Sequence, residues 1–103
     1  MVAQGELWLM ETPAGKNRPG LVVTRNEVIP VLNSVVVAPV TTTVRDIPTC
    51  IPVGRRNGLH RPSVASFDNL AAVHKSLLKH RLGSLHAGGH RLICEALRAV
   101  AAC

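Results

Sequence analysis

The chain has 103 residues and carries 12 Lys and Arg against 6 Asp and Glu, which gives a formal net charge of +6. Hydrophobic residues make up 47% and charged residues 17%, a balance that indicates a packed globule and excludes a disordered tail. This length predicts one domain over residues 1–103. A small domain this basic usually binds an acidic partner, most often a nucleic acid, although the charge can also serve solubility alone.

We expect a cytoplasmic protein without membrane, metal or cofactor. The N-terminus has no basic stretch followed by an apolar run, so secretion is not expected. The longest apolar run, Val35–Val40, is far shorter than the roughly 20 residues that span a bilayer. Cys50, Cys94 and Cys103 form no CxxC pair and indicate reduced thiols, and the five histidines also lack metal-ligand spacing.

The N-terminal third predicts two strands joined by a loop. Gly5–Glu11 alternates as a strand does, with much of both faces buried. Thr12–Arg18 has the Pro, Gly and Asn content of a loop. Gly20–Thr24 is a β-branched run that Pro19 can open, because the first residue of a strand need not donate to the ladder. Asn26–Asn33 is a connection whose proline excludes a long helix.

Ser34–Val40 is the clearest strand in the sequence. Its Pro39 is expected at a sheet edge or bulge, since proline cannot donate to the ladder. Gly54–Pro62 is a basic loop. Further short strands are predicted at Thr49–Val53, Ser63–Leu70 and Arg81–Leu85.

The C-terminal stretch changes from a strand period to a helical one. Apolar residues recur at helical spacing and predict a helix from His90 onward: Leu92, Ile93, Ala96, Leu97 and Val100. Short strands followed by one helix indicate a small, strongly bent antiparallel sheet or barrel closed by a helix. The predicted fold class is therefore mainly β with a C-terminal helix.

Three segments, in this order, resemble the MazF/PemK toxins. Gly5–Thr24 (GELWLMETPAGKNRPGLVVT) is similar to their first hairpin, in which an Arg-Pro pair opens the second strand. Ser34–Val53 (SVVVAPVTTTVRDIPTCIPV) is similar to their central strand, which runs into a threonine or serine. Gly58–Val73 (GLHRPSVASFDNLAAV) resembles their S-V-x-x-x-D-Q/N segment. The likeness covers nearly the whole chain.

This resemblance implies both a fold and an activity. The fold would be an SH3-like small β-barrel with a C-terminal helix, assembled as a two-fold homodimer. The activity would be that of a type II toxin, a metal-independent endoribonuclease that cuts single-stranded RNA and arrests growth. The ribose 2′-OH would attack the phosphorus and leave 2′,3′-cyclic phosphate and 5′-OH ends. The implied partner is an antitoxin whose acidic, partly disordered C-terminal segment blocks the RNA groove.

The resemblance also places three catalytic residues. The family's catalytic arginine falls on Arg18, its catalytic threonine on Thr41 and its acidic position on Asp68. A guanidinium suits the non-bridging phosphate oxygens because its fixed fork of donors matches them in pairs. A threonine hydroxyl can add one more donor to the same oxygens.

The general base is not assigned by the sequence. Some relatives use a histidine in the first loop, and this loop has none; Ser66 stands where others have an arginine. Asp68, Glu11 and His60 therefore stay open as proton carriers, and each could equally be structural.

Residues beside the loops are candidates for RNA binding because phosphates could reach them. They are Lys16, Arg25, Thr42, Arg55, Arg56, Arg61 and Asn69. Lys75, Lys79 and Arg81 form a second basic cluster. Trp8 and Phe67 are the two aromatic residues, and we expect Trp8 in the core or a dimer interface. Because so few aromatic rings are available, the planar side chains of arginine or histidine would have to stack on the bases.

Two other functions stay open. A toxin of the same fold could poison DNA gyrase instead of cutting RNA, but the chain lacks the C-terminal tryptophan that we associate with that activity. A non-catalytic SH3-like module could bind nucleic acid through the same basic loops. Binding of RNA without products would distinguish that module from a nuclease.

Overall fold

The computed structural model describes residues 1–102, and Cys103 lies outside the described residues. Within this part of the chain seven strands precede one α-helix, α1 (Gly89–Ala101). The strands are β1 (Glu6–Glu11), β2 (Asn17–Val22), β3 (Ser34–Thr41), β4 (Cys50–Val53), β5 (Ser63–Ser66), β6 (Ala71–His74) and β7 (Leu78–Ser84). Single 3-10 turns are η1 (Ile29–Val31), η2 (Arg55–Asn57), η3 (Phe67–Asn69) and η4 (Lys75–Leu77). The predicted mainly β fold with a C-terminal helix is confirmed.

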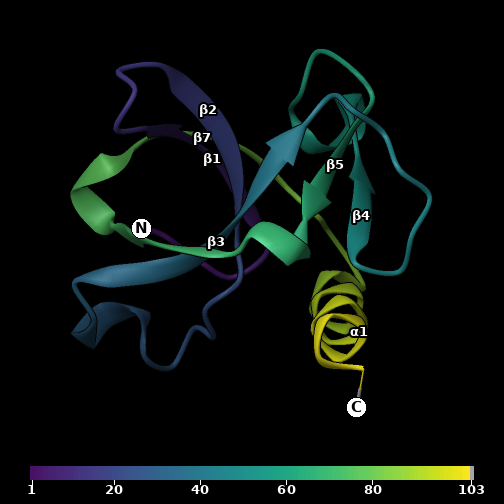
Figure 1. The fold of residues 1–103 in the computed structure, drawn as a ribbon. Helices are drawn as coiled ribbons and strands as arrows, with labels where there is room; N and C mark the ends of the chain where they lie inside the picture. Colours follow the sequence, from purple (N-terminus) through teal and green to yellow (C-terminus); the bar gives the residue numbers. More distant parts are fainter. Residues whose placement is uncertain (103) are drawn as a thin grey trace.

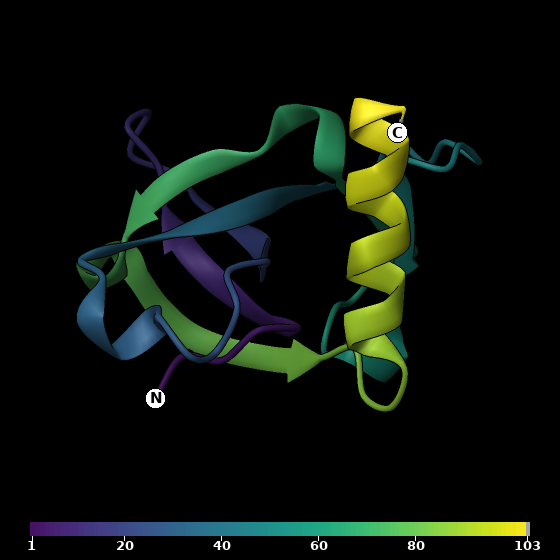
Figure 2. The same ribbon diagram turned by 90° about the horizontal axis from the view of Figure 1, so that it is seen from below.

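The strands form one antiparallel sheet in the order β4-β5-β3-β2-β1-β7. On one side of β3, its first half pairs with β6 and its last two residues, Val40 and Thr41, pair with β5. The sheet curls into a partial barrel, and α1 lies beside the end formed by β4 and β5 (Figures 1 and 2). This curl brings the β1–β2 loop and the end of β3 onto the same side of the molecule.

Pro39 does not lie at a sheet edge, one of the two predicted positions, because β3 is an inner strand. Pro39 pairs with Gly20 of β2 on one side. On its other side it falls between the stretches of β3 that pair with β6 and with β5. A proline is tolerated there because no neighbouring strand needs its missing N–H.

Several boundaries differ from the sequence prediction. β2 begins at Asn17, three residues before the predicted Gly20, because the Thr12 N–H and hydroxyl both donate to the Lys16 carbonyl (3.1 and 2.7 Å) and close the loop early. The strand predicted over Ser63–Leu70 ends at Ser66 and turns into η3. β6 was not predicted, and β7 starts three residues before the predicted Arg81. The helix was predicted to within one residue of its start.

Both faces of β3 contribute side chains to the core, which explains most of its apolar run, although Val36 is exposed. Val35 and Val37 belong to one core cluster, while Ala38 and Val40 belong to the other. Ile93 of α1 packs in the cluster that contains Ala38 and Val40. Complete burial of one such side chain stabilises the fold by about 1.5–3 kcal/mol.

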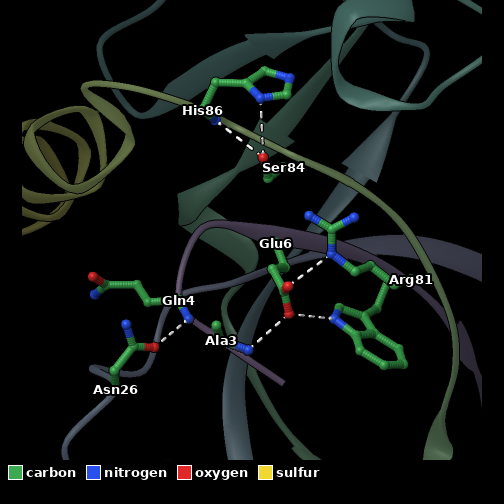
Figure 3. A network of polar contacts seen from close by, with 8 residues as sticks. Ala3, Gln4, Glu6, Asn26, Arg81, Ser84 and His86 are labelled. Atoms are coloured by element: carbon green, nitrogen blue, oxygen red, sulfur yellow. Dashed lines mark hydrogen bonds and ion pairs between the residues drawn. The ribbon is translucent and has the colours of Figure 1, made fainter. Parts of the chain in front are cut away.

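A polar network ties β1 to the N-terminus and to β7 (Figure 3). The Glu6 carboxylate accepts hydrogen bonds from the Ala3 N–H (2.8 Å), the Trp8 indole N–H (3.0 Å) and the Arg81 guanidinium (2.7 Å). Burial opposes ionisation of Glu6, but the hydrogen bonds from Trp8, Arg81 and Ala3, together with the charge of Arg81, hold its pKa below the ordinary 4.5. Trp8 packs against a core cluster, as expected for a core residue.

The lowered pKa of Glu6 makes the fold sensitive to acid. Ionised Glu6 stabilises the protein above its unfolded pKa, and this contribution is lost as pH falls through the lower folded pKa. We expect Glu6→Gln to lower the free energy of unfolding at pH 7, measured in urea melts, by about 1–3 kcal/mol. Below pH 4.5 the variant should lose less of its free energy of unfolding than the wild type does. Glu11→Gln, which breaks a 3.6 Å pair between half-exposed side chains, should change little. Equal losses in the two variants would contradict this role of Glu6.

Cys50 and Cys94 are free and partly buried thiols, as predicted. Cys103, the third predicted thiol, lies outside the described residues. Among residues 1–102, no helix has both the length and the apolar character needed to cross a membrane.

Candidate functional site

One open pocket brings together the two residues predicted to act on the phosphate. It has a volume of about 320 Å³ and lies where the start of β2 faces the end of β3. Its lining residues are Lys16, Asn17, Arg18, Pro19, Val40, Thr41, Thr42 and Ser63. We call this the central pocket. It contains Arg18 and Thr41, and also Lys16 and Thr42 from the predicted RNA-binding set.

Arg18 is held by strand pairing and not by a loop. It lies opposite Met10 of β1, and the next residue, Pro19, lies opposite Leu9. Pairing fixes the backbone on both sides of Arg18, and the proline ring restricts its own φ. The Arg18 side chain is exposed and free to bind a ligand.

Thr41 is the last residue of β3, and its hydroxyl is oriented by the chain that follows. The Thr43 N–H donates to Thr41 Oγ1 at 3.2 Å. Because this bond uses the oxygen as an acceptor, the hydroxyl proton stays available for donation. Thr41 can therefore donate to a phosphate oxygen in the central pocket.

Two further pockets extend the central pocket into a groove. The loop pocket, of about 300 Å³, shares Thr41 with it and is lined by Thr41, Thr43, Arg45, Cys50, Val64, Ser66 and Asn69. The apolar pocket, of about 370 Å³, shares Pro19, Thr42 and Ser63 with it and is lined by Leu9, Pro19, Thr42, Gly58, Leu59, His60, Arg61, Ser63 and Leu82. The three pockets together are called the groove below.

Each of the three pockets of the groove carries at least one Lys or Arg. Lys16, Arg18, Arg45 and Arg61 line it, whereas no Asp or Glu lines any of its three pockets. Within residues 1–102 none of these four side chains has a hydrogen-bond or ion-pair partner. Unpaired cations facing one open groove favour an anionic ligand with several charges, such as a nucleic-acid backbone.

Asp68 does not line the groove, although its neighbour Asn69 does. The Asp68 carboxylate accepts a 2.7 Å hydrogen bond from the Thr49 hydroxyl, and Asn69 donates to Ser66 Oγ at 3.0 Å. Thr49 ends the loop that begins at Thr41. Asp68 thus ties this loop to η3 and contacts the groove through its neighbours.

The other predicted RNA-binding arginines do not line the groove. Arg25 follows the far end of β2, whereas Arg18 lies at its start. Arg55 and Arg56 are in η2, and Arg56 lines a different pocket beside α1. RNA binding by these three arginines stays a prediction.

All three side chains of the second basic cluster have partners that the sequence did not indicate. Lys79 pairs with Glu11 at 3.6 Å and Arg81 with Glu6 at 2.7 Å. Lys75 donates to the Ile29 carbonyl at 2.9 Å. These contacts link β7 to β1 and η4 to η1, whereas the cations of the groove are unpaired within residues 1–102.

Of the three proton-carrier candidates, one lines the groove. Glu11 is paired with Lys79, and Asp68 is bonded to Thr49. His60 lines the apolar pocket, next to the central one. In the described part of the chain no three His, Cys, Asp or Glu side chains are grouped to hold a metal ion.

Arg45 and Ser63 line the groove but were not singled out from the sequence. Arg45 follows the Thr41–Thr43 run by two residues, so its charge close to that run was the available signal. Ser63 opens a strand, and nothing local distinguishes it from other strand serines.

Comparison with known proteins identifies the family. The profile of the PemK-like, MazF-like toxins of type II toxin–antitoxin systems matches residues 3–101. The chain belongs to this family. It is 44% identical to endoribonuclease MazF3 of Mycobacterium tuberculosis over 82 residues, which are 80% of each chain. It is 34% identical to the probable endoribonuclease MazF5 of the same organism, covering 98% of this chain and 94% of that one.

Solved structures of the family share the fold. The Mycobacterium tuberculosis toxin MazF-mt6 superposes with a TM-score of 0.85 at 37% identity, covering 94% of this chain and 96% of the toxin. A mycobacterial endoribonuclease in complex with its cognate antitoxin gives 0.84 at 25% identity, covering 99% and 96%. The predicted family and enzyme class are confirmed: the chain is an endoribonuclease of the MazF toxin type.

Proposed function

We propose that this MazF-like toxin cuts single-stranded RNA in the groove, with the scissile phosphate in the central pocket. Arg18 and Thr41 donate to its non-bridging oxygens and stabilise the charge that develops on them. The observation that carries this proposal is the convergence of Arg18 and Thr41 on one pocket of a groove with four unpaired cations and no carboxylate.

In this reaction the 2′-oxygen of the ribose loses its proton and bonds to the adjacent phosphorus, while the bond from phosphorus to the 5′-oxygen of the next nucleotide breaks. The leaving 5′-oxygen takes up a proton, so the net reaction moves one proton from the 2′-oxygen to the 5′-oxygen. The products carry a 2′,3′-cyclic phosphate and a 5′-OH. No metal is needed, since the guanidinium supplies the positive charge that a cation would otherwise supply. A groove without carboxylates also offers a hard divalent cation no anionic ligand.

The remaining site residues have supporting roles in this proposal. Lys16, Thr42, Arg61 and Asn69 hold the RNA on either side of the scissile phosphate. Asp68 positions the loop that carries Thr41, through its bond to Thr49. The groove's lack of carboxylates favours catalysis mainly by preorganised positive charge.

The assembly is proposed on the resemblance. The protein forms an SH3-like small barrel over residues 1–103, pairs as a homodimer in the cytoplasm, and is inhibited by an antitoxin with an acidic C-terminal segment. The complex of a mycobacterial relative with its cognate antitoxin supports such a partner, and the +6 net charge suits an acidic one. Sedimentation of the purified toxin tests the homodimer, and a single monomeric species would exclude it.

The test is incubation of the purified protein with a long single-stranded RNA in EDTA, followed by mapping of the cut ends. We expect discrete cuts whose downstream fragments accept a kinase-transferred phosphate without prior dephosphorylation, as a 5′-OH requires. Cutting that needs added Mg²⁺, or 5′-phosphate ends, would contradict the mechanism. RNA that is bound but stays intact would instead favour the non-catalytic binding module.

A further inference from the structure

The apolar pocket at one end of the groove differs in character from the rest of it. Its walls are Leu9 of β1, Leu59 of the η2–β5 loop, Leu82 of β7 and Pro19 of β2. It shares Pro19, Thr42 and Ser63 with the central pocket, so the two are continuous. An apolar space directly beside a phosphate site does not suit another phosphate, because an anion there would lose its hydration.

Two flat side chains lie at this pocket. His60 and Arg61 line it, and both are exposed. Neither side chain has a hydrogen-bond or ion-pair partner among residues 1–102. An imidazole ring and a guanidinium plane are groups on which unpaired RNA bases stack.

The loop that carries these two residues is held in place at several points. Asn57 Nδ2 donates to the Ser84 carbonyl at 2.9 Å, and His86 Nε2 donates to the Arg56 carbonyl at 2.7 Å. Ser84 is the last residue of β7, and His86, which contacts its hydroxyl, lies between β7 and α1 (Figure 3). Ser63 Oγ donates to the Arg61 carbonyl at 3.0 Å. The backbone is thus preorganised while the His60 and Arg61 side chains stay free, which reduces the entropy lost on binding.

We propose that the apolar pocket binds the base of a nucleotide adjacent to the scissile phosphate. The base packs on the leucine walls and stacks against His60, with Arg61 beside it. This subsite, which rests on the proposed RNA cleavage, makes His60 a specificity-determining residue of the toxin.

The aromatic content of the chain supports this assignment. Trp8 donates to Glu6 and packs against a core cluster, and Phe67 is buried. Neither ring can serve as a stacking platform in the groove. Base recognition then depends on planar side chains that are exposed in the groove, and His60 stands directly beside apolar walls.

The experiment measures cleavage of a short RNA that spans a mapped cut and of matched RNAs with an abasic nucleotide at each flanking position. On the intact RNA, we expect His60→Ala to lower kcat/KM by about 10- to 100-fold, the range typical of a lost base–aromatic stack. At one flanking position, the abasic RNA should be cut equally by the wild type and His60→Ala, because neither complex then contains the stack. Base preference at that position, read from sequenced cut ends, should become nearly uniform.

His60→Phe separates base stacking from proton transfer, since phenylalanine keeps a ring but carries no proton. We expect this variant to retain the base preference and cleave within about fivefold of the wild type. Slow cleavage by both variants on every RNA, abasic ones included, would make His60 a proton carrier and overturn the subsite. If the wild type cleaves RNA and His60→Ala keeps the same base preferences, the subsite is overturned while the proposed RNA cleavage stands. No cleavage by the wild type would overturn the proposed function and the subsite with it.

Discussion

We expect Arg18→Ala to lower kcat on a cleavable single-stranded RNA by about 10²–10³-fold, the loss typical of removing one preorganised donor to a developing oxyanion. Arg18 is held by β1–β2 pairing at the edge of the central pocket and has no protein partner for its side chain within residues 1–102. Its removal therefore breaks no interaction of the fold. The loss should fall mainly on kcat, measured with the RNA that spans a mapped cut.

Companion variants in the same assay test the details. Arg18→Lys keeps the charge but loses the fork of donors, so it should restore only part of the rate. Thr41→Ser keeps the hydroxyl and should stay near the wild type, whereas Thr41→Ala should not. Arg98→Ala, which removes an exposed cation from α1, is the matched control and should leave kcat unchanged. Equal activity of Arg18→Ala and Arg98→Ala would exclude a catalytic role for Arg18.

Asp68 gives a finer test of the positioning proposal. If it acts through Thr49, Asp68→Asn and Thr49→Val should each slow cleavage less than Arg18→Ala. The double variant should be no slower than the single ones, because all three lose the same contact. Additive losses would show that Asp68 acts on the RNA separately.

The largest expected effect on stability is that of Gly83→Ala. A Cβ at Gly83 would lie 2.1 Å from the Asn57 carbonyl oxygen, and one at Gly58 would lie 1.9 Å from that of Leu82. These neighbours are backbone atoms of η2 and β7, which cannot move aside as a side chain can. We expect Gly83→Ala to cost about 3 kcal/mol or more, and to lower Tm by roughly 12–24 °C in a domain of this size.

Gly15→Ala is the matched control for this prediction. Gly15 has a positive φ of +80° but no atom within 4 Å of its Cβ position, so the variant meets backbone strain without a clash. Gly15→Ala should lower the free energy of unfolding by about 1–2 kcal/mol. Thermal and urea unfolding of both variants measure the difference. A Gly83→Ala variant as stable as Gly15→Ala would show that η2 and β7 separate freely, and the preorganised loop of His60 and Arg61 would lose its basis.

Much of the fold follows from local patterns. The alternation in β1, the apolar run of β3 and the helical period of α1 all predicted their elements. β6 was missed because Ala71–His74 has few β-branched or aromatic residues, and its pairing with β3 decides its conformation. η3 was missed because the apolar residues Val64, Ala65 and Phe67 favoured a continuing strand, against the turn-forming residues Asp68 and Asn69.

The site was less accessible to sequence reasoning than the fold. Arg18 and Thr41 are 23 positions apart, and the resemblance to the toxin family, not their spacing, predicted that they act together. The neutral character of the Lys79 and Arg81 cluster depends on pairing between β1 and β7, some 70 positions apart along the chain. The apolar pocket likewise depends on the packing of Gly58 against Gly83, which has no local signature.

The central claim is that RNA is cut between Arg18 and Thr41. Its most direct test is a crystal structure of the protein with an RNA that spans a mapped cut and carries a 2′-O-methyl group in place of the nucleophile. We predict the scissile phosphate in the central pocket, with its non-bridging oxygens about 3 Å from the Arg18 guanidinium and Thr41 Oγ1. RNA bound along β7, with its phosphates away from both residues, would contradict the account.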